Sequence, residues 1–328
     1  MTPTMVDSKV LTRAVELACR APSLHNSQPW RWVAAGPTVD LFSDPRRVVP
    51  SADNSGRESI ISCGAVLDHF RVAMAAEGWS THTDEFPNPN NLDHLASVDF
   101  VSADYVAAGR RDRAAAILRR RTDRRPFGAP PDWASFEPVL RTAVDGDRVS
   151  LDVLADDARP RLVEAGRLNE ALRRYDDVYH HELRWWTAPG RHDDGIPEAA
   201  LVNEGQPRTI EVNRRFPGDP RARTSSAVPP DHAKVLALST PGDARADAFR
   251  CGQALSAILL ECTMAGLATC TVTHVTELPA SREMIRELVS DAEAVPQLLI
   301  RVGTAPAGKG QPDPTPRRPI SDVLEMRG

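Results

Sequence analysis

The stretch CGAVLDHFRVAMAAEGWST, residues 63–81, returns without a gap as CGQALSAILLECTMAGLAT, residues 251–269. Both copies begin with Cys-Gly, share a Leu at the fifth place and an Ala-rich face, and end with a helix-stopping Gly followed by a Thr. A unit that occurs twice in one chain indicates two related lobes built on the same helix. Ala-rich helices can also resemble one another by chance, so the segments that flank the two copies carry the rest of the argument.

Composition sets broad limits on the class of protein. The chain has 328 residues, enough for two domains of ordinary size. A net charge of -5 gives no overall basic field, so we expect no nucleic-acid partner. The five cysteines show no CxxC or metal-ligand spacing, which favours small buried residues in a reducing compartment. With no long apolar run and no apolar leader, we expect a cytoplasmic protein that does not enter a membrane.

The periodicity of apolar residues predicts a mixed fold, α/β in the wide sense and α+β in detail. Helices are expected over residues 8–20, 58–77, 159–186 and 246–266, and at the start of the arginine-rich run 110–127. A hairpin is expected over residues 30–42, and strands at 149–154 and 298–302. Residues 80–104 are expected to form a Pro/Asn-rich loop, a weakly amphipathic stretch and a short strand at 98–101. We divide the chain into a first lobe, residues 1–112, and a second lobe, residues 113–328.

The least regular part of the chain runs from residue 187 to residue 232 and is rich in Pro, Gly, Arg and Asp. A loop of that length inside a compact domain is usually functional or disordered. We interpret it as a lid inserted in the second lobe.

The segment APSLHNSQPW, residues 21–30, concentrates hydroxyl, amide and imidazole groups between two prolines. Pro22 and Pro29 fix the backbone, so that Ser23, Asn26 and Gln28 can face outward and meet a planar heterocycle. The alternative is a capped turn whose polar side chains satisfy a helix end while Trp30 fills the core.

The segment RRRTDRRPF, residues 119–127, carries five arginines, and a second basic pair, Arg317 and Arg318, lies near the other end of the lobe. Guanidinium groups from two remote segments suit a phosphate, because each charge-assisted hydrogen bond adds affinity. The alternative is a solvated basic helix end, which is the usual meaning of a charge run.

These motifs together resemble the nitroreductase family. APSLHNSQPW is similar to its APSxxNxQPW segment, RRTDRRPF resembles its RRS-x-R phosphate motif, and GLATCTVTH, IRVGTAP and TPRRPISDVL resemble its closing pattern. Their distribution over two lobes of one chain resembles the Acg-type branch. The resemblance implies tandem nitroreductase-like lobes that mimic the family's homodimer, with one FMN per chain between them.

The resemblance also implies roles for individual residues. Arg120, Thr122 and Arg124 would hold the phosphate together with Arg317 or Arg318. Because Asp123 interrupts the motif, the register can shift by one residue and bring in Arg121 or Arg125. The isoalloxazine or ribityl would meet Pro22, Ser23, Leu24, Asn26 and Gln28 from the opposite lobe, and the backbone of Thr273 and His274 would lie by the reactive edge of the ring.

Three further features have a plainer interpretation. His25 could donate a proton to a reduced product, but a histidine in such a turn is more often a structural hydrogen-bonding group. His180 and His181 are adjacent on a helix and cannot converge on one metal ion, so no metal is predicted. Trp185 and Trp186 are expected to pack in the core or the lid rather than stack on nucleic acid.

Two functions remain open. The first is an NAD(P)H-dependent reductase of nitroaromatic or quinone-type acceptors, in which the nicotinamide binds transiently because no Rossmann motif is present. The second is an FMN storage protein whose lid closes the flavin. The resemblance implies that Acg-type proteins are associated with stress or dormancy and are often described as reductases, which does not decide between the two functions. A monomer is favoured over a dimer, since the lobe interface replaces a subunit interface.

Overall fold

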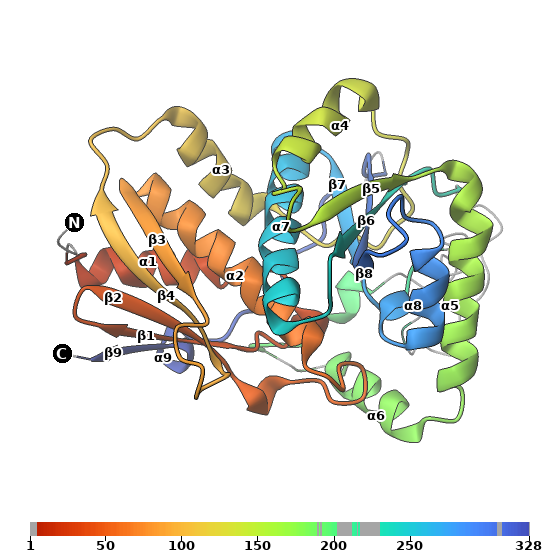
Figure 1. Ribbon diagram of the computed structural model, residues 1–328, viewed down its shortest axis with the longest axis horizontal. Coiled ribbons are helices and arrows are strands. Elements are labelled where there is room, and N and C mark those ends of the chain that lie inside the picture. The colour runs from red at the N-terminus through yellow and green to blue at the C-terminus, as the bar shows by residue number, and fades with distance from the viewer. Residues whose placement is uncertain are drawn as a thin grey trace.

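The computed structural model describes residues 5–188, 190, 192–201, 212–214, 216, 230–306 and 310–327. Two β-sheets lie on either side of a central pair of helices, α2 (Arg57–Ala76) and α7 (Arg245–Met264). Helices α1 and α3 pack against α2, and α5 and α8 lie together at the far side of the second sheet (Figure 1). The expected mixed fold with two lobes is therefore confirmed.

The first sheet has five strands in the order β3-β4-β2-β1-β9. Their bounds are β1 Trp30–Ala35, β2 Thr38–Ser43, β3 Trp79–Glu85, β4 His94–Ser102 and β9 Leu324–Arg327. The expected hairpin is β1 and β2, which pair antiparallel across a turn at Gly36. The loop expected at the start of residues 80–104 was wrong, because β3 is a strand there, whereas the short strand expected at 98–101 lies within β4. The residues of β3 alternate between half-buried and exposed along an edge of the sheet, so β3 lacks the apolar face by which a strand is found.

The second sheet has four antiparallel strands in the order β5-β6-β8-β7. Their bounds are β5 Ser150–Leu154, β6 Lys234–Thr240, β7 Ala268–Val272 and β8 Val295–Gly303. The sequence predicts β5 and β8, whereas β6 and β7 were missed. The central strands are buried almost throughout, as expected for strands covered on both faces.

The helices agree with the apolar periodicity where their buried face is wide. Their bounds are α1 Ser8–Ala18, α2 Arg57–Ala76, α3 Ala108–Arg119, α4 Trp133–Thr142, α5 Arg159–Arg173, α6 Asp177–Trp186, α7 Arg245–Met264, α8 Pro279–Arg286 and α9 Ile320–Val323. The stretch 159–186 is two helices rather than one, and α4 and α8 were not predicted.

The repeated sequence forms the interface between the lobes. Gly64 of α2 and Gly252 of α7 occupy equivalent places in the repeat, and they meet where the two helices cross. A Cβ on Gly64 would overlap the Phe249 carbonyl oxygen, and a Cβ on Gly252 would overlap the Ile61 carbonyl oxygen. Residues 61 and 249 are also equivalent, so the contact is reciprocal, as at a two-fold subunit interface. The repeat therefore places one lobe on the other by a pseudo-two-fold axis.

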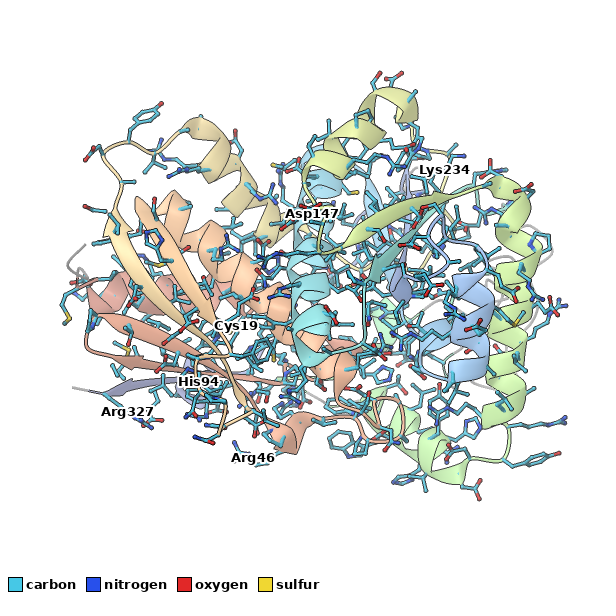
Figure 2. The ribbon with its side chains drawn as sticks, in the orientation of Figure 1. Cys19, Arg46, His94, Asp147, Lys234 and Arg327 are labelled. Atoms are coloured by element: carbon cyan, nitrogen blue, oxygen red, sulfur yellow. The ribbon has the colours of Figure 1, made fainter. Side chains whose placement is uncertain are left out.

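The C-terminal segment returns to the first lobe. Strand β9 pairs parallel with β1, with Trp32 opposite Leu324, and so completes the first sheet. Arg327 of β9 lies at the first-lobe end of the molecule, far from Lys234 of the second sheet (Figure 2). The division between residues 112 and 113 falls inside α3, and we keep it as a proposal for the end of the first lobe's continuous chain.

Among the described helices, one is long and apolar enough to cross a membrane. It is α2, and 72% of its most apolar window is buried inside the protein. Its position between the lobes accounts for that composition. All five cysteines are buried free thiols, as predicted for small core residues.

Candidate functional site

The segment between α1 and β1 takes an irregular course that decides which side chains face inward. His25, Asn26 and Gln28 have positive φ values of 49°, 59° and 52°. Such a left-handed conformation is unusual for residues other than glycine and tends to persist at functional sites. The Ser23 hydroxyl steadies the turn by accepting the Gln28 backbone N–H at 3.0 Å. As a result, residues 22–25 line a cavity between the lobes.

This cavity, which we call the ring pocket, takes its walls from both lobes. The first lobe contributes Pro22, Ser23, Leu24 and His25, and helix α2 adds Glu58 and Ile61. The second lobe contributes Thr122, Arg124, Leu255 and the end of β7 with the turn after it, Thr271 to His274. The pocket thus combines an apolar slot with polar groups at its rim, which is the usual character of a cofactor site.

A second cavity, which we call the anion pocket, shares Pro22, Ser23, Thr122 and Arg124 with the ring pocket. Four further arginines line it. They are Arg20, Arg120, Arg121 and Arg317. Among the described lining residues Asp313 is the one carboxylate, and it is exposed.

The anion pocket carries more positive charge than the described carboxylates around it neutralise. Burial, with the charges of Arg121 and Arg20, lowers the pKa of Arg120 to about 10. Burial and the neighbouring arginines also hold the pKa of Arg317 well below its usual range. The Nε atoms of Arg120 and Arg121 are buried and find no partner among the described residues. Unpaired buried guanidinium groups are costly, so this pocket is suited to an anion with several acceptor oxygens, such as a phosphate.

Arg317 both lines the anion pocket and shapes it. Its guanidinium donates to the carbonyl oxygens of Cys19 and Arg20 at 2.6 and 2.9 Å, and to Asn26 Oδ1 at 2.9 Å. Carbonyls at the end of a helix lack partners within the helix, and here Arg317 supplies them. The C-terminal tail thereby fixes the loop that follows α1.

Arg318 and Gln28 are placed differently from the other predicted site residues, because neither lines the described cavities. The Arg318 guanidinium donates to the carbonyl oxygens of Gln28 and Trp30 at 3.2 and 3.3 Å. The Gln28 side chain accepts the Arg318 backbone N–H at 2.9 Å and donates to the Asp193 carbonyl at 2.8 Å. The two residues therefore brace the turn from behind. The other predicted site residues all line one of the two pockets.

Comparison with known proteins gives the family. No family model matches the sequence. Over 327 residues the chain is 53% identical to the Mycobacterium tuberculosis H37Rv protein named "Putative NAD(P)H nitroreductase acg", covering 100% of this chain and 98% of the relative. The chain belongs to the Acg nitroreductase family.

Two solved structures are similar to this Acg-family chain at low identity. A "putative nitroreductase" of Anabaena variabilis aligns with 91% of this chain and 74% of its own at 9% identity and a TM-score of 0.48. A nitroreductase with bound FMN from Bacteroides fragilis aligns with 62% of this chain and 93% of its own at 14% identity and a TM-score of 0.39.

The lid expected over residues 187–232 lies partly outside the described residues, namely 189, 191, 202–211, 215 and 217–229. Its described parts contact residues of both pockets. Asn26 Nδ2 donates to the Gly195 carbonyl at 3.1 Å, and Arg124 donates to the Ala200 carbonyl at 3.0 Å. Ile196, Asn213, Arg214 and Phe216 form part of the ring-pocket wall.

A buried ion pair holds one described part of the lid in this Acg-family chain. The Arg214 guanidinium pairs with the Glu277 carboxylate, whose side chain is 0% exposed, and donates to the Tyr179 hydroxyl at 3.0 Å. The charge of Glu277 keeps the pKa of Arg214 above its usual range despite burial. The sequence offered no signal for this pair, because its members are far apart in the chain and lie in different elements.

The sequence missed two residues of the site, Arg20 and Glu58, and left the protonation of two histidines open. Arg20 directly follows α1 and was not recognised as a candidate. Glu58 was missed because an acidic residue in the first turn of a helix is common and needs no functional explanation. In the structure its side chain is buried at the ring pocket. Burial lowers the pKa of His274 to about 3, and burial with Arg214 and Arg124 lowers the pKa of His25 well below 6.5. Both imidazoles are therefore neutral at pH 7.

Proposed function

We propose that one FMN binds across the two pockets and that the chain is an NAD(P)H-dependent reductase of nitroaromatic or quinone-type acceptors. The observation that carries the proposal is the joined pair of pockets: a cavity with apolar and polar walls continues into a group of arginines that have no carboxylate partner among the described residues. FMN has the same two parts, a planar ring system and a phosphate with close to two negative charges. Family membership supports the same conclusion.

In this proposal each lobe supplies a different part of the site. Arg20, Arg120, Arg121 and Arg317 would hold the phosphate, with Thr122 and Arg124 at the junction of the pockets. Pro22, Ser23 and Leu24 would lie against the ring from the first lobe, and Thr273 and His274 from the second. A bound FMN would supply hydride chemistry between NAD(P)H and the acceptor. The protein's part is to orient the ring, exclude water and leave one face for both substrates in turn.

We propose a single FMN per chain because the pseudo-symmetric position is built differently. A cavity of about 700 Å³ lies there. Its Arg250 and Glu85 stand where the ring pocket has Ser62 and Thr273, and they pair with each other at 3.0 Å. Helix α7 has no counterpart of APSLHNSQPW before it. A ring system there would have to displace an existing ion pair, and Ser62 and Thr273 of the ring pocket impose no such cost.

Storage of FMN is the second candidate, and the lid is what favours it. A nicotinamide must approach the ring closely for hydride transfer. Described lid residues stand in the ring-pocket wall, and the buried Arg214–Glu277 pair anchors them. Turnover therefore requires the lid to open, whereas storage does not.

Purified protein distinguishes the candidates. We expect a yellow protein whose colour is FMN, and anaerobic NADPH or NADH should bleach it if the chain is a reductase. Flavin that stays oxidised with both nucleotides, yet bleaches with dithionite, would support storage. Protein that neither carries nor takes up FMN would contradict both functions.

A further inference from the structure

One carboxyl group in the ring pocket has no role in the function proposed above. Glu58 lies in the first turn of α2, its side chain is 2% exposed, and it lines the pocket beside Leu24 and His274. Its Oε2 atom is buried and has no hydrogen-bond partner among the described residues. A buried carboxyl oxygen without a partner is costly if the group is ionised. The protein keeps it where a bound molecule could meet it.

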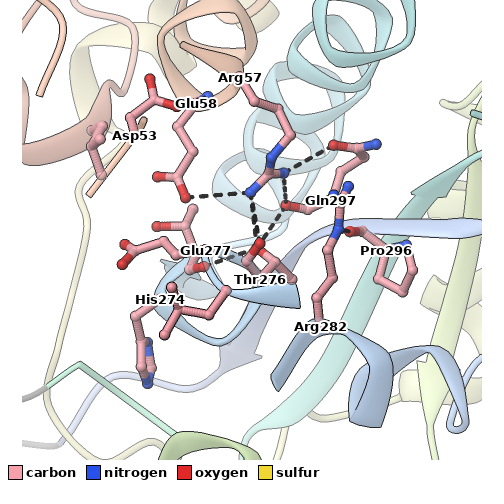
Figure 3. Close-up of polar contacts among 12 residues, drawn as sticks. Asp53, Arg57, Glu58, His274, Thr276, Glu277, Arg282, Pro296 and Gln297 are labelled. Carbon is pink, nitrogen blue, oxygen red and sulfur yellow. Dashed lines mark hydrogen bonds and ion pairs between the residues drawn. The ribbon is translucent and has the colours of Figure 1, made fainter. Parts of the chain in front are cut away.

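The neighbouring cation does little to neutralise Glu58. Arg57 Nη2 is 3.5 Å from Glu58 Oε1, which is a weak contact. The same guanidinium donates to the Gln297 carbonyl at 2.7 Å, to Gln297 Oε1 at 2.9 Å and to the Thr276 carbonyl at 3.1 Å (Figure 3). Arg57 is thus engaged by better acceptors, and Glu58 receives only a small share of its charge.

Two anions and a further cation face Glu58 from other elements. Asp53 accepts the backbone N–H groups of Glu58 and Ser59 at 2.9 and 2.8 Å, which caps α2 and leaves a carboxylate close by. Glu277 stands opposite, held by Arg214 of the lid. Burial first, and then the charges of Glu277 and Asp53, raise the pKa of Glu58 well above its usual range against the opposing effect of Arg57 and Arg214. The neutral acid is therefore the form present near pH 7.

The other titratable groups of the ring pocket are poor acids at that pH. His25 and His274 are neutral imidazoles, and Arg124 and Arg214 are guanidinium groups. Among the described lining residues Glu58 is thus the one carboxylic acid with a proton to give. Glu58 therefore places that proton in the wall of the ring pocket.

We propose that Glu58 is the proton donor of the site and protonates the acceptor during its reduction. The inference rests on the proposed function. A quinone needs one hydride, which the flavin chemistry provides, and one proton to become a hydroquinone. The Glu58 O–H bond breaks, its proton forms the new O–H bond of the acceptor, and the electron pair remains on Glu58 as a carboxylate. The charges of Arg57 and Arg214 offset only part of the cost of burying that carboxylate, so Glu58 takes up a proton from solvent again.

The first test compares an acceptor that needs a proton with one that does not. Wild-type protein and a Glu58→Gln variant are loaded with FMN, reduced with dithionite, and mixed with benzoquinone or with ferricyanide. We expect the variant to lose about 100-fold or more in reoxidation by benzoquinone, the usual size of a general-acid contribution, and less than about twofold with ferricyanide. Equal losses with both acceptors would overturn the proposal, and so would wild-type flavin that ferricyanide reoxidises but benzoquinone does not.

Asp68→Asn is the matched control for that comparison. Asp68 is another buried carboxyl of α2 whose pKa burial raises, but it lines the pseudo-symmetric cavity and bonds to Ser256. We expect its benzoquinone rate to match wild type. If Glu58→Gln does not fold, the wild-type pH profile serves instead. Its benzoquinone rate should fall about tenfold per pH unit once Glu58 ionises, while its ferricyanide rate stays level; a level benzoquinone rate up to about pH 10 would overturn the proposal.

FMN affinity gives a second readout that does not depend on turnover. Titration of the apoprotein with FMN from about pH 7 to pH 9.5 should show wild-type affinity falling as Glu58 becomes an anion, and a smaller fall for Glu58→Gln, which keeps only the contribution of the arginines of the anion pocket. Identical profiles would contradict the proton donor while leaving the proposed function intact. Failure of the wild-type apoprotein to bind FMN at any pH would instead contradict the proposed function itself.

Discussion

Arg120 carries a charge that the apoprotein does not compensate, and this gives opposite expectations for stability and for binding. Replacing it in Arg120→Met removes a buried cation that burial and two other arginines disfavour. The free energy of unfolding of the apoprotein should stay level or rise, while FMN affinity falls by about tenfold or more, because a charge-assisted bond to the phosphate is lost. Urea denaturation and flavin titration measure the two effects.

Arg119→Met is the control for that substitution, since Arg119 is the exposed neighbour in the same run. Arg119→Met should change neither the free energy of unfolding of the apoprotein nor the FMN affinity appreciably. FMN affinity that is unaltered by Arg120→Met would remove Arg120 from the phosphate site.

His274 makes stability depend on pH with a definite sign. Its folded pKa is about 3, below the ordinary value of 6.5, so the unfolded chain takes up the proton first as pH falls. The contribution of the neutral His274 to the free energy of unfolding is therefore complete above about pH 6.5. It decreases by about 1.4 kcal/mol for each pH unit as the pH falls from there to about 3. Between pH 7.5 and 5, the free energy of unfolding of His274→Gln should therefore fall by about 2 kcal/mol less than that of wild type, measured with urea. An equal fall would mean that the folded site tolerates a protonated His274.

At the scale of elements, the two helices of the repeat depend on the absence of side chains at their crossing. Gly64→Ala should lower the free energy of unfolding by several kcal/mol, because its Cβ would overlap a backbone carbonyl that a helix cannot move. Gly109→Ala, in α3 with open space around it, should be neutral or slightly stabilising. A mild effect at Gly64 would show that α2 and α7 can separate without cost.

The described lid is an element whose hold on the site can be tested through its anchor. Arg214→Gln removes the buried pair with Glu277 and should loosen the lid. If closure limits access, the flavin of this variant should be reduced by NADPH at least about tenfold faster than that of wild type in anaerobic stopped-flow. Arg286→Gln, which removes an exposed pair on α8, should not change the rate. No acceleration in Arg214→Gln would show that this pair does not gate the site.

The elements also show which parts of the fold could be predicted from the sequence. Wide apolar faces predicted α1, α2, α7 and the first hairpin, because burial on one side leaves a periodic pattern. Strand β3 left no such pattern, since its residues are half-buried or exposed. Arg317 lines the anion pocket and its neighbour Arg318 does not. The sequence motif identified both arginines as candidates, but it could not show which of the two lines the pocket. The contact of Arg214 with Glu277 depends on the folding of remote segments and leaves no local trace.

At the scale of the whole molecule, the unequal lobes predict a stoichiometry. Denatured holoprotein, saturated beforehand, should release close to one FMN per chain, because the second cavity pairs its own charges. We also expect the chain to work as a monomer, since each lobe supplies what a second subunit would. The flavin absorbance against chain concentration measures the ratio, and native mass measures the assembly. A ratio near two, or one flavin for two chains, would contradict the split of the motifs.

The parallel pairing of β9 with β1 has a consequence for the order in which the molecule is made. Residues 30–35 leave the ribosome early, yet their partner at residues 324–327 follows every other described element. At synthesis rates of about 5–20 residues per second, the outer edge of β1 waits for roughly 15 to 60 seconds. An open strand edge invites pairing with other chains, so the nascent protein is exposed to aggregation throughout that interval. The lobe that is translated first is thus the one that is finished last.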